Sequence, residues 1–173
     1  MILGMSMSTF IAVHVALSLV GIATGLVVLY AMVQGKHAAA AAALFLGTTV
    51  LTSATGFPIP PHGFDPPRAF GVLSLALLAF SLLGLYAYKL AGAWRRVYVI
   101  TALAALYLNC FVAVVQTFQK VRFFHALAPT QAEPPFFVAQ LLLLGAFVVL
   151  GVLAVRRFHP LPASPAVVRA TAG

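Results

Sequence analysis

The stretch that decides the fold is YVITALAALYLNCFVAVVQTFQKV, residues 98–121, followed by RFFHALAPTQAEPPF, residues 122–136. Residues 97–119 carry no charged side chain, and a helix needs about 20 apolar residues to cross a bilayer. Asn109 and Gln116 nevertheless stand seven residues apart within this window, on one helix face. We interpret the stretch as a membrane helix with a polar seam that leads into a shaped extracytoplasmic loop.

The composition identifies lipid as the main solvent of the chain. Of its 173 residues, 63% are hydrophobic and only 7% are charged, and the mean hydropathy is +1.09. A soluble domain carries about 25% charged residues. The single cysteine, Cys110, excludes a disulfide framework. Because the basic residues stand at the ends of apolar runs, membrane topology explains the net charge of +8, and we expect no nucleic-acid partner.

Charge-free windows predict an all-α fold, a bundle of five transmembrane helices at about residues 9–33, 38–56, 69–88, 97–122 and 135–155. Prolines exclude helix from the connection PIPPHGFDPP, residues 58–67, and from the loop after helix four. The first ten residues lack a basic n-region, so we expect the first span to be retained. We predict one transmembrane domain, residues 1–158, and a flexible cytoplasmic tail, residues 159–173.

The distribution of basic residues predicts the orientation. Seven of them fall on one side of the predicted bundle, at Lys36, Lys89, Arg95, Arg96, Arg156, Arg157 and Arg169, and three on the other, at Arg68, Lys120 and Arg122. Cytoplasmic loops are enriched in lysine and arginine. We therefore expect the N-terminus outside and the C-terminus in the cytoplasm.

Polar side chains at one depth suggest a ligand pocket. Counting residues from the predicted helix ends places several of them about 7–10 Å below the outer surface, and polar groups in hydrocarbon tend to face the bundle interior or a wet cavity. The candidate pocket residues are His14, Thr52, Asn109, Gln116 and Gln140. The candidate rim, in the outer loops, consists of His62, Asp65, His125, Gln131 and Glu133.

A purely structural interpretation of the same residues stays open. Helices in lipid meet through small residues and interhelical hydrogen bonds. The first span carries such a face, with His14 and Ser18 followed by the GxxxG motif of Gly21 and Gly25. The polar seam can therefore be packing alone.

The chemistry that the residues permit is limited. No phosphate-binding loop, nucleophile elbow or metal-ligand spacing is present, so we expect no catalytic residue and no metal site. His14 is the only histidine inside a span, whereas haem held by two histidines needs a second one at matched depth. Without such a partner we expect no cofactor, with haem b or a quinone bound at His14 as the alternative.

Three stretches carry a resemblance. LTSATGFPIPPHGFDPPRAFGVLSL (51–75), LAGAWRRVYVITALAALYLNCFVAVVQTF (90–118) and ALAPTQAEPPFFVAQ (126–140) resemble a group of small, uncharacterised bacterial membrane proteins over roughly residues 45–157. The most distinctive part is YLNCFVAVVQ with APTQAEPPF. The resemblance implies a bacterial inner-membrane protein and carries over no site residue.

The favoured hypothesis is a non-enzymatic bacterial inner-membrane protein that binds a small molecule or a partner protein through its outer loops and polar pocket. The alternatives are a redox-associated protein that binds haem or quinone through His14, and a channel or exporter for a small neutral solute. The expected partners are the lipid bilayer and either other membrane subunits or further copies of this chain.

Overall fold

The computed structural model describes residues 4–59 and 66–160, which form helices and no strand. The helices are α1 (Met7–Val33), α2 (Ala39–Gly56), α3 (Pro66–Leu82) with its π-helical continuation (Leu83–Ala87), α4 (Ala93–Lys120), α5 (Arg122–Leu127) and α6 (Pro134–Arg157). The prediction of an all-α helical bundle is confirmed. Residues 161–173 of the predicted tail lie outside the described residues.

Five helices in the described part of the chain are long and apolar enough to cross a membrane: Met7–Val33, Ala39–Gly56, Arg68–Ala87, Ala93–Lys120 and Pro134–Arg157. Many of their large apolar side chains are exposed, among them Leu142, Tyr30 and Val149. Outward-facing apolar side chains on every span indicate contact with a lipid bilayer.

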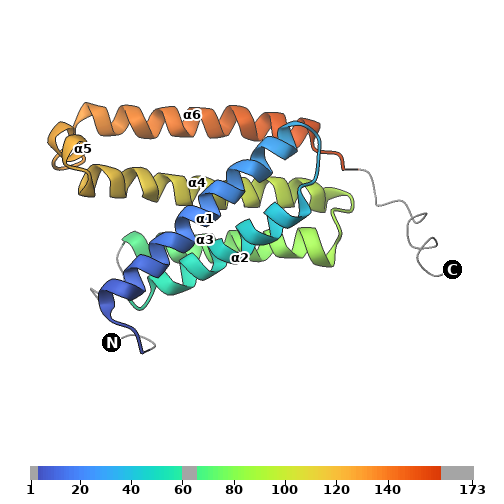
Figure 1. The fold of residues 1–173 in the computed structure, drawn as a ribbon. Coiled ribbons are helices and arrows are strands. Elements are labelled where there is room, and N and C mark those ends of the chain that lie inside the picture. The colour runs from blue at the N-terminus through green and yellow to red at the C-terminus, as the bar shows by residue number, and fades with distance from the viewer. Residues whose placement is uncertain (1–3, 60–65, 161–173) are drawn as a thin grey trace.

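Helix α4 lies at the centre of the bundle and contacts α1, α2, α3, α5 and α6. In Figure 1, α4 and α6 run side by side and α1 crosses them obliquely. The start of α1 and the short helix α5 lie at one end, which we call the α5 end, and the last turn of α6 lies at the opposite end. The segment YVITALAALYLNCFVAVVQTFQK, residues 98–120, is thus part of the helix on which the other helices pack.

Glycines allow α1 to approach its neighbours closely. A Cβ at Gly21 would lie 3.0 Å from Oγ1 of Thr49, and one at Gly25 would lie 2.5 Å from a methyl carbon of Leu106. Both glycines are buried. Helix association in lipid depends on such close packing, because apolar side chains gain nothing by leaving lipid for one another. The GxxxG face of α1 therefore meets α2 and α4.

Two local features differ from the sequence prediction. The fourth helix, expected to reach residue 122, ends at Lys120 because Val121 is extended. Residues 123–127, expected to be loop, form α5 together with Arg122, and this segment contains neither proline nor glycine. The third span ends in a π-helical turn, in which the amide of Tyr88 donates to the carbonyl of Leu83 at 2.9 Å. Gly84 lies in this turn against α4, where a Cβ would be 3.1 Å from the carbonyl oxygen of Trp94.

At the end opposite α5, Arg95 of α4 forms hydrogen bonds with the C-terminal end of α6. Its Nη1 donates to the carbonyl oxygens of Val155 at 3.2 Å and Phe158 at 2.5 Å. These carbonyls belong to the helix terminus, where a cation also faces the negative end of the helix dipole. The contact fixes α6 against the rest of the bundle.

Candidate functional site

A cavity of about 610 Å³ lies between α1, α2, α3 and α4, in the half of the bundle nearer the α5 end. Its lining on α4 extends from Leu108 to Val121, which is about 20 Å along a helix that rises 1.5 Å per residue. Its apolar wall includes Ile11, Val15, Leu19, Phe57, Phe70 and Val112. Four of the five predicted pocket residues also line it: His14, Thr52, Asn109 and Gln116.

His14 is held by a hydroxyl of the neighbouring helix. Its Nδ1 lies 2.9 Å from Oγ1 of Thr55. We assign the one proton of the Thr55 hydroxyl to the carbonyl oxygen of Leu51, at 2.7 Å, because threonine in a helix commonly donates to its own backbone; with this assignment its oxygen accepts from Nδ1–H of His14. In the neutral imidazole this arrangement leaves a bare lone pair on Nε2.

Asn109 lies at the inner end of the cavity, at the junction of α1, α2 and α4. Its Nδ2 donates to Oγ1 of Thr49 at 3.4 Å, and a Cβ at Gly21 would come within 3.6 Å of the same nitrogen. The amide therefore finds its partner on another helix, as a polar group far from water must.

Two buried hydroxyls line the cavity without a partner. Thr52 is 7% exposed and Ser74 is 5% exposed, and neither hydroxyl has a hydrogen-bond partner within residues 4–59 and 66–160. Serine and threonine in membrane helices commonly donate back to a carbonyl of their own helix, as Thr55 does. The hydroxyls of Thr52 and Ser74 make no such bond, so within the described residues their capacity to donate is unused.

The polarity of the cavity changes toward the α5 end. Gln116 and Lys120 are exposed, whereas Thr52 and Ser74 are buried. Arg68 also lines the cavity, and its Nη2 donates to the carbonyl oxygens of Phe57 and Ile59 at 3.3 and 2.8 Å. The cavity therefore leads from an open basic end to a closed end lined with hydroxyls.

Gln140, the fifth predicted pocket residue, lies elsewhere. It is not among the residues that line the cavity; its Nε2 donates to the carbonyl oxygen of Phe111 at 3.3 Å, between α6 and α4. The expectation that Gln140 joins His14 and Gln116 is wrong, because equal depth does not place side chains on the same side of α4.

The three described rim residues are not part of the cavity lining. His125, Gln131 and Glu133 lie in the α4–α6 connection. His62 and Asp65 fall outside the described residues. Gln131, with a φ of 61°, donates from Nε2 to the carbonyl oxygen of Val115 at 3.1 Å. Gln131 thus anchors the connection to α4.

The carboxylate of Glu133 forms hydrogen bonds with other residues of the same connection. Its Oε1 accepts from the amide and the hydroxyl of Thr130, at 3.2 and 2.9 Å, and its Oε2 accepts from the amide of Ala132 at 3.1 Å. Burial acts to raise the pKa of Glu133, but these hydrogen bonds outweigh it and hold the pKa below its ordinary value. The carboxylate therefore accepts its hydrogen bonds from residues of its own connection, Thr130 and Ala132.

The described residues contain no group of three or more His, Cys, Asp or Glu side chains placed to hold a metal ion. His37 lies in the α1–α2 connection near the ring of Phe158, and burial lowers its pKa. Of the histidines at positions 14, 37, 125 and 159, only His14 lines the cavity.

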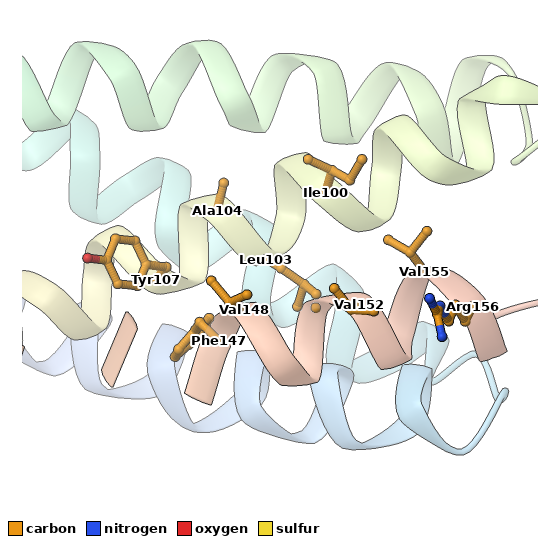
Figure 2. Close-up of a pocket in the computed structure, with 10 residues that line it drawn as sticks. Ile100, Leu103, Ala104, Tyr107, Phe147, Val148, Val152, Val155 and Arg156 are labelled. Atoms are coloured by element: carbon orange, nitrogen blue, oxygen red, sulfur yellow. The ribbon is translucent and has the colours of Figure 1, made fainter. Parts of the chain in front are cut away.

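A second groove, of about 470 Å³, runs between α4 and α6 on the side away from the hydroxyls. Figure 2 shows its lining: apolar side chains of α4 and α6 from Tyr107 and Phe147 toward Arg156. Between these ends the lining side chains are all apolar, so polar side-chain groups line the groove only at its ends, at Tyr107 and Arg156.

No protein-family model matches this chain, and no curated protein or solved structure matches it. The geometry of the cavity is therefore the basis for an assignment. Sequence reasoning missed Thr55 and Thr49, the partners of His14 and Asn109. Their signal was the spacing of hydroxyl residues along α2, at positions 48, 49, 52, 53 and 55.

Proposed function

We propose that this chain is a non-enzymatic protein of the bacterial inner membrane that binds a small molecule in the cavity between α1, α2, α3 and α4. The observation that carries the proposal is the pair of buried, unpartnered hydroxyls of Thr52 and Ser74 in the wall of a 610 Å³ cavity. Polar groups inside a membrane domain are costly, and where they line a cavity they mark a binding site or a pathway.

The size and shape of the cavity support a small molecule over a partner protein. Ligand pockets have volumes of about 300–1,000 Å³, are mostly apolar and contain a few placed polar groups. Most of the surface of this wall is apolar, and polar side chains of all four helices are distributed along it. A partner protein would need an exposed surface, whereas the hydroxyls of Thr52 and Ser74 are buried inside the bundle.

The proposed orientation places the α5 end outside the cell. The described basic residues at the opposite end are Lys36, Lys89, Arg95, Arg96, Arg156 and Arg157, against Arg68, Lys120 and Arg122 at the α5 end. This bias supports a cytoplasmic opposite end. The cavity would then open toward the outer face.

The orientation is tested by labelling two exposed alanines, one at each end, in a chain whose Cys110 is replaced by alanine. A membrane-impermeant maleimide added to intact cells should label Ala126→Cys and should label Ala93→Cys only after the cells are opened. The reverse pattern contradicts the orientation.

The binding function is tested by comparing what copurifies with two matched variants. The protein is extracted with its surrounding membrane in polymer nanodiscs, and bound molecules are identified by mass spectrometry. Ala113→Phe fills the cavity, and Ala104→Phe places the same bulk in the α4–α6 groove. We expect a molecule that is retained by the wild type and by Ala104→Phe and depleted in Ala113→Phe. Equal retention in all three contradicts the proposed function.

A further inference from the structure

The lining of the cavity also restricts the chemistry of its ligand, and this inference rests on the proposed function. Because the Thr55 hydroxyl donates to Leu51 and accepts from Nδ1–H of His14, the free ring nitrogen of the neutral histidine is an acceptor. Within the described residues no group donates to Nε2. A ligand that uses this nitrogen must bring a donor of its own.

The two unpartnered hydroxyls can supply hydrogen-bond donors, whereas Nε2 of His14 is an acceptor. Thr52 on α2 and Ser74 on α3 are each more than nine-tenths buried, and each hydroxyl can donate one hydrogen bond. An oxygen of the ligand placed beside them would satisfy these donors. The cavity therefore presents an acceptor on α1 and donors on α2 and α3.

The remaining wall excludes several ligand classes. No described lining residue is acidic, and Lys120 lines the α5 end, so an organic cation would meet a like charge there. Most of the surface of the cavity is apolar. A small hydrophilic solute would leave this surface unused, whereas an apolar molecule dissolved in the membrane would cover it.

Haem fits the lining less well. Nε2 of His14 can bind iron, but the flat apolar body of the macrocycle would leave the hydroxyls of Thr52 and Ser74 buried without a partner, which is costly. A ligand with two oxygens on a small apolar ring uses all three groups.

We propose that the cavity binds a quinol-type molecule, an apolar ring with two oxygen substituents. One hydroxyl of the ring donates to Nε2 of His14, and the other oxygen accepts from the hydroxyls of Thr52 and Ser74. The apolar wall contacts the ring and the start of its hydrocarbon chain. The proposal concerns binding and requires no electron transfer.

The test uses the wild-type protein first. Lipid-exchanged protein in phosphatidylcholine nanodiscs is titrated anaerobically with 2-decylhydroquinone and with its dimethyl ether, which keeps the ring, both oxygens and the chain but has no donor. Loss of one good hydrogen bond lowers affinity about three- to tenfold, so we expect the ether to bind at least threefold more weakly. Equal affinity for the two probes overturns the proposal without requiring any variant to fold.

Two pairs of variants locate the contacts. His14→Phe should bind the hydroquinone at least threefold more weakly and should no longer distinguish it from the ether. Ser74→Ala should weaken binding, whereas Ser81→Ala should not, because Ser81 is also a buried α3 serine but pairs with Thr101 at 2.8 Å, away from the cavity. Equal effects of the two serine substitutions overturn the assignment of Ser74.

The outcome separates this inference from the proposed function. If the molecule depleted in Ala113→Phe is a phospholipid without a free hydroxyl, or haem with its Soret band, the binding function stands and the quinol inference fails. If no molecule is depleted in that variant and neither probe binds at millimolar concentration, both fail.

Discussion

The imidazole Nδ1 of His14, on α1, lies 2.9 Å from the hydroxyl oxygen of Thr55, on α2, and that hydroxyl is itself committed to the carbonyl of Leu51. A side chain of one helix thus determines which nitrogen of a histidine on another helix carries the proton. The consequence is chemical, because it decides whether the nitrogen left to the cavity accepts or donates a hydrogen bond.

Replacing Thr55 with valine should release the histidine from this constraint. Valine keeps the shape of threonine but cannot accept, so His14 should populate both neutral tautomers, which differ in their ring ¹⁵N chemical shifts. The control is Thr48→Val, since the hydroxyl of Thr48 bonds only to its own helix, at the carbonyls of Leu44 and Phe45. Unchanged His14 shifts in Thr55→Val would show that the hydroxyl does not select the tautomer.

The close approach of α1 predicts a large difference between two glycines. A Cβ at Gly25 would lie 2.5 Å from a methyl carbon of Leu106 and 2.9 Å from the ring of Phe45, whereas a Cβ at Gly47 would meet nothing within 4 Å. Gly25→Ala should therefore destabilise the bundle by about 1–3 kcal/mol, the usual cost of overpacking. Gly47→Ala should be neutral or stabilising by up to about 1 kcal/mol, because alanine is the better helix former.

Reversible unfolding in mixed detergent micelles measures both changes. Equal stability of the two variants would mean that α1 can move away from Leu106 at no cost, and that the GxxxG face does not hold the bundle together.

The sequence predicted the parts of the site that depend on depth. Helix ends could be estimated from charged residues and prolines, so counting residues inward placed His14, Thr52 and Gln116 at comparable heights, and all three line one cavity. The face of α1 was also predictable, because Gly21 and Gly25 mark where a neighbour approaches.

Rotation of a helix about its own axis was not predictable in the same way. Helix α6 is apolar on all sides, so nothing in its pattern shows which way Gln140 points, and the structure places Gln140 against the carbonyl of Phe111. The partners of Gln131 and Glu133 were not predictable for another reason: polar side chains in a short connection often form hydrogen bonds within the connection or to the adjoining helix.

Arg95 should be important for stability where its neighbour Arg96 is not. Arg95 is half-buried and donates to the carbonyls of Val155 and Phe158, whereas Arg96 is exposed. Hydrogen bonds from a charged group contribute about 1.5–3 kcal/mol, so Arg95→Ala should cost about that much in the free energy of unfolding. Arg96→Ala should change it by less than about 0.5 kcal/mol. Indistinguishable unfolding curves for the two variants would contradict the role assigned to Arg95.

The last prediction concerns the pH response of the α4–α6 connection. Because hydrogen bonds from Thr130 and Ala132 hold the pKa of Glu133 below its ordinary value, the native state binds a proton less readily than the unfolded chain. The carboxylate therefore stabilises the connection fully above the ordinary pKa of glutamate, and this contribution is lost as the pH falls through the lowered pKa. Glu133 is the only glutamate in the chain, so uniform ¹³C labelling of glutamate yields a single carboxyl signal to titrate.

Thr130→Val removes the hydroxyl that donates to Oε1 at 2.9 Å and should raise the pKa of Glu133 toward its ordinary value. Thr130→Ser keeps a hydroxyl at the same position and should leave the pKa low. The amide of Thr130 and that of Ala132 remain in both variants, so the valine variant should recover only part of the shift. A wild-type pKa at the ordinary value, or identical titrations for the serine and valine variants, would show that the connection does not depend on this carboxylate.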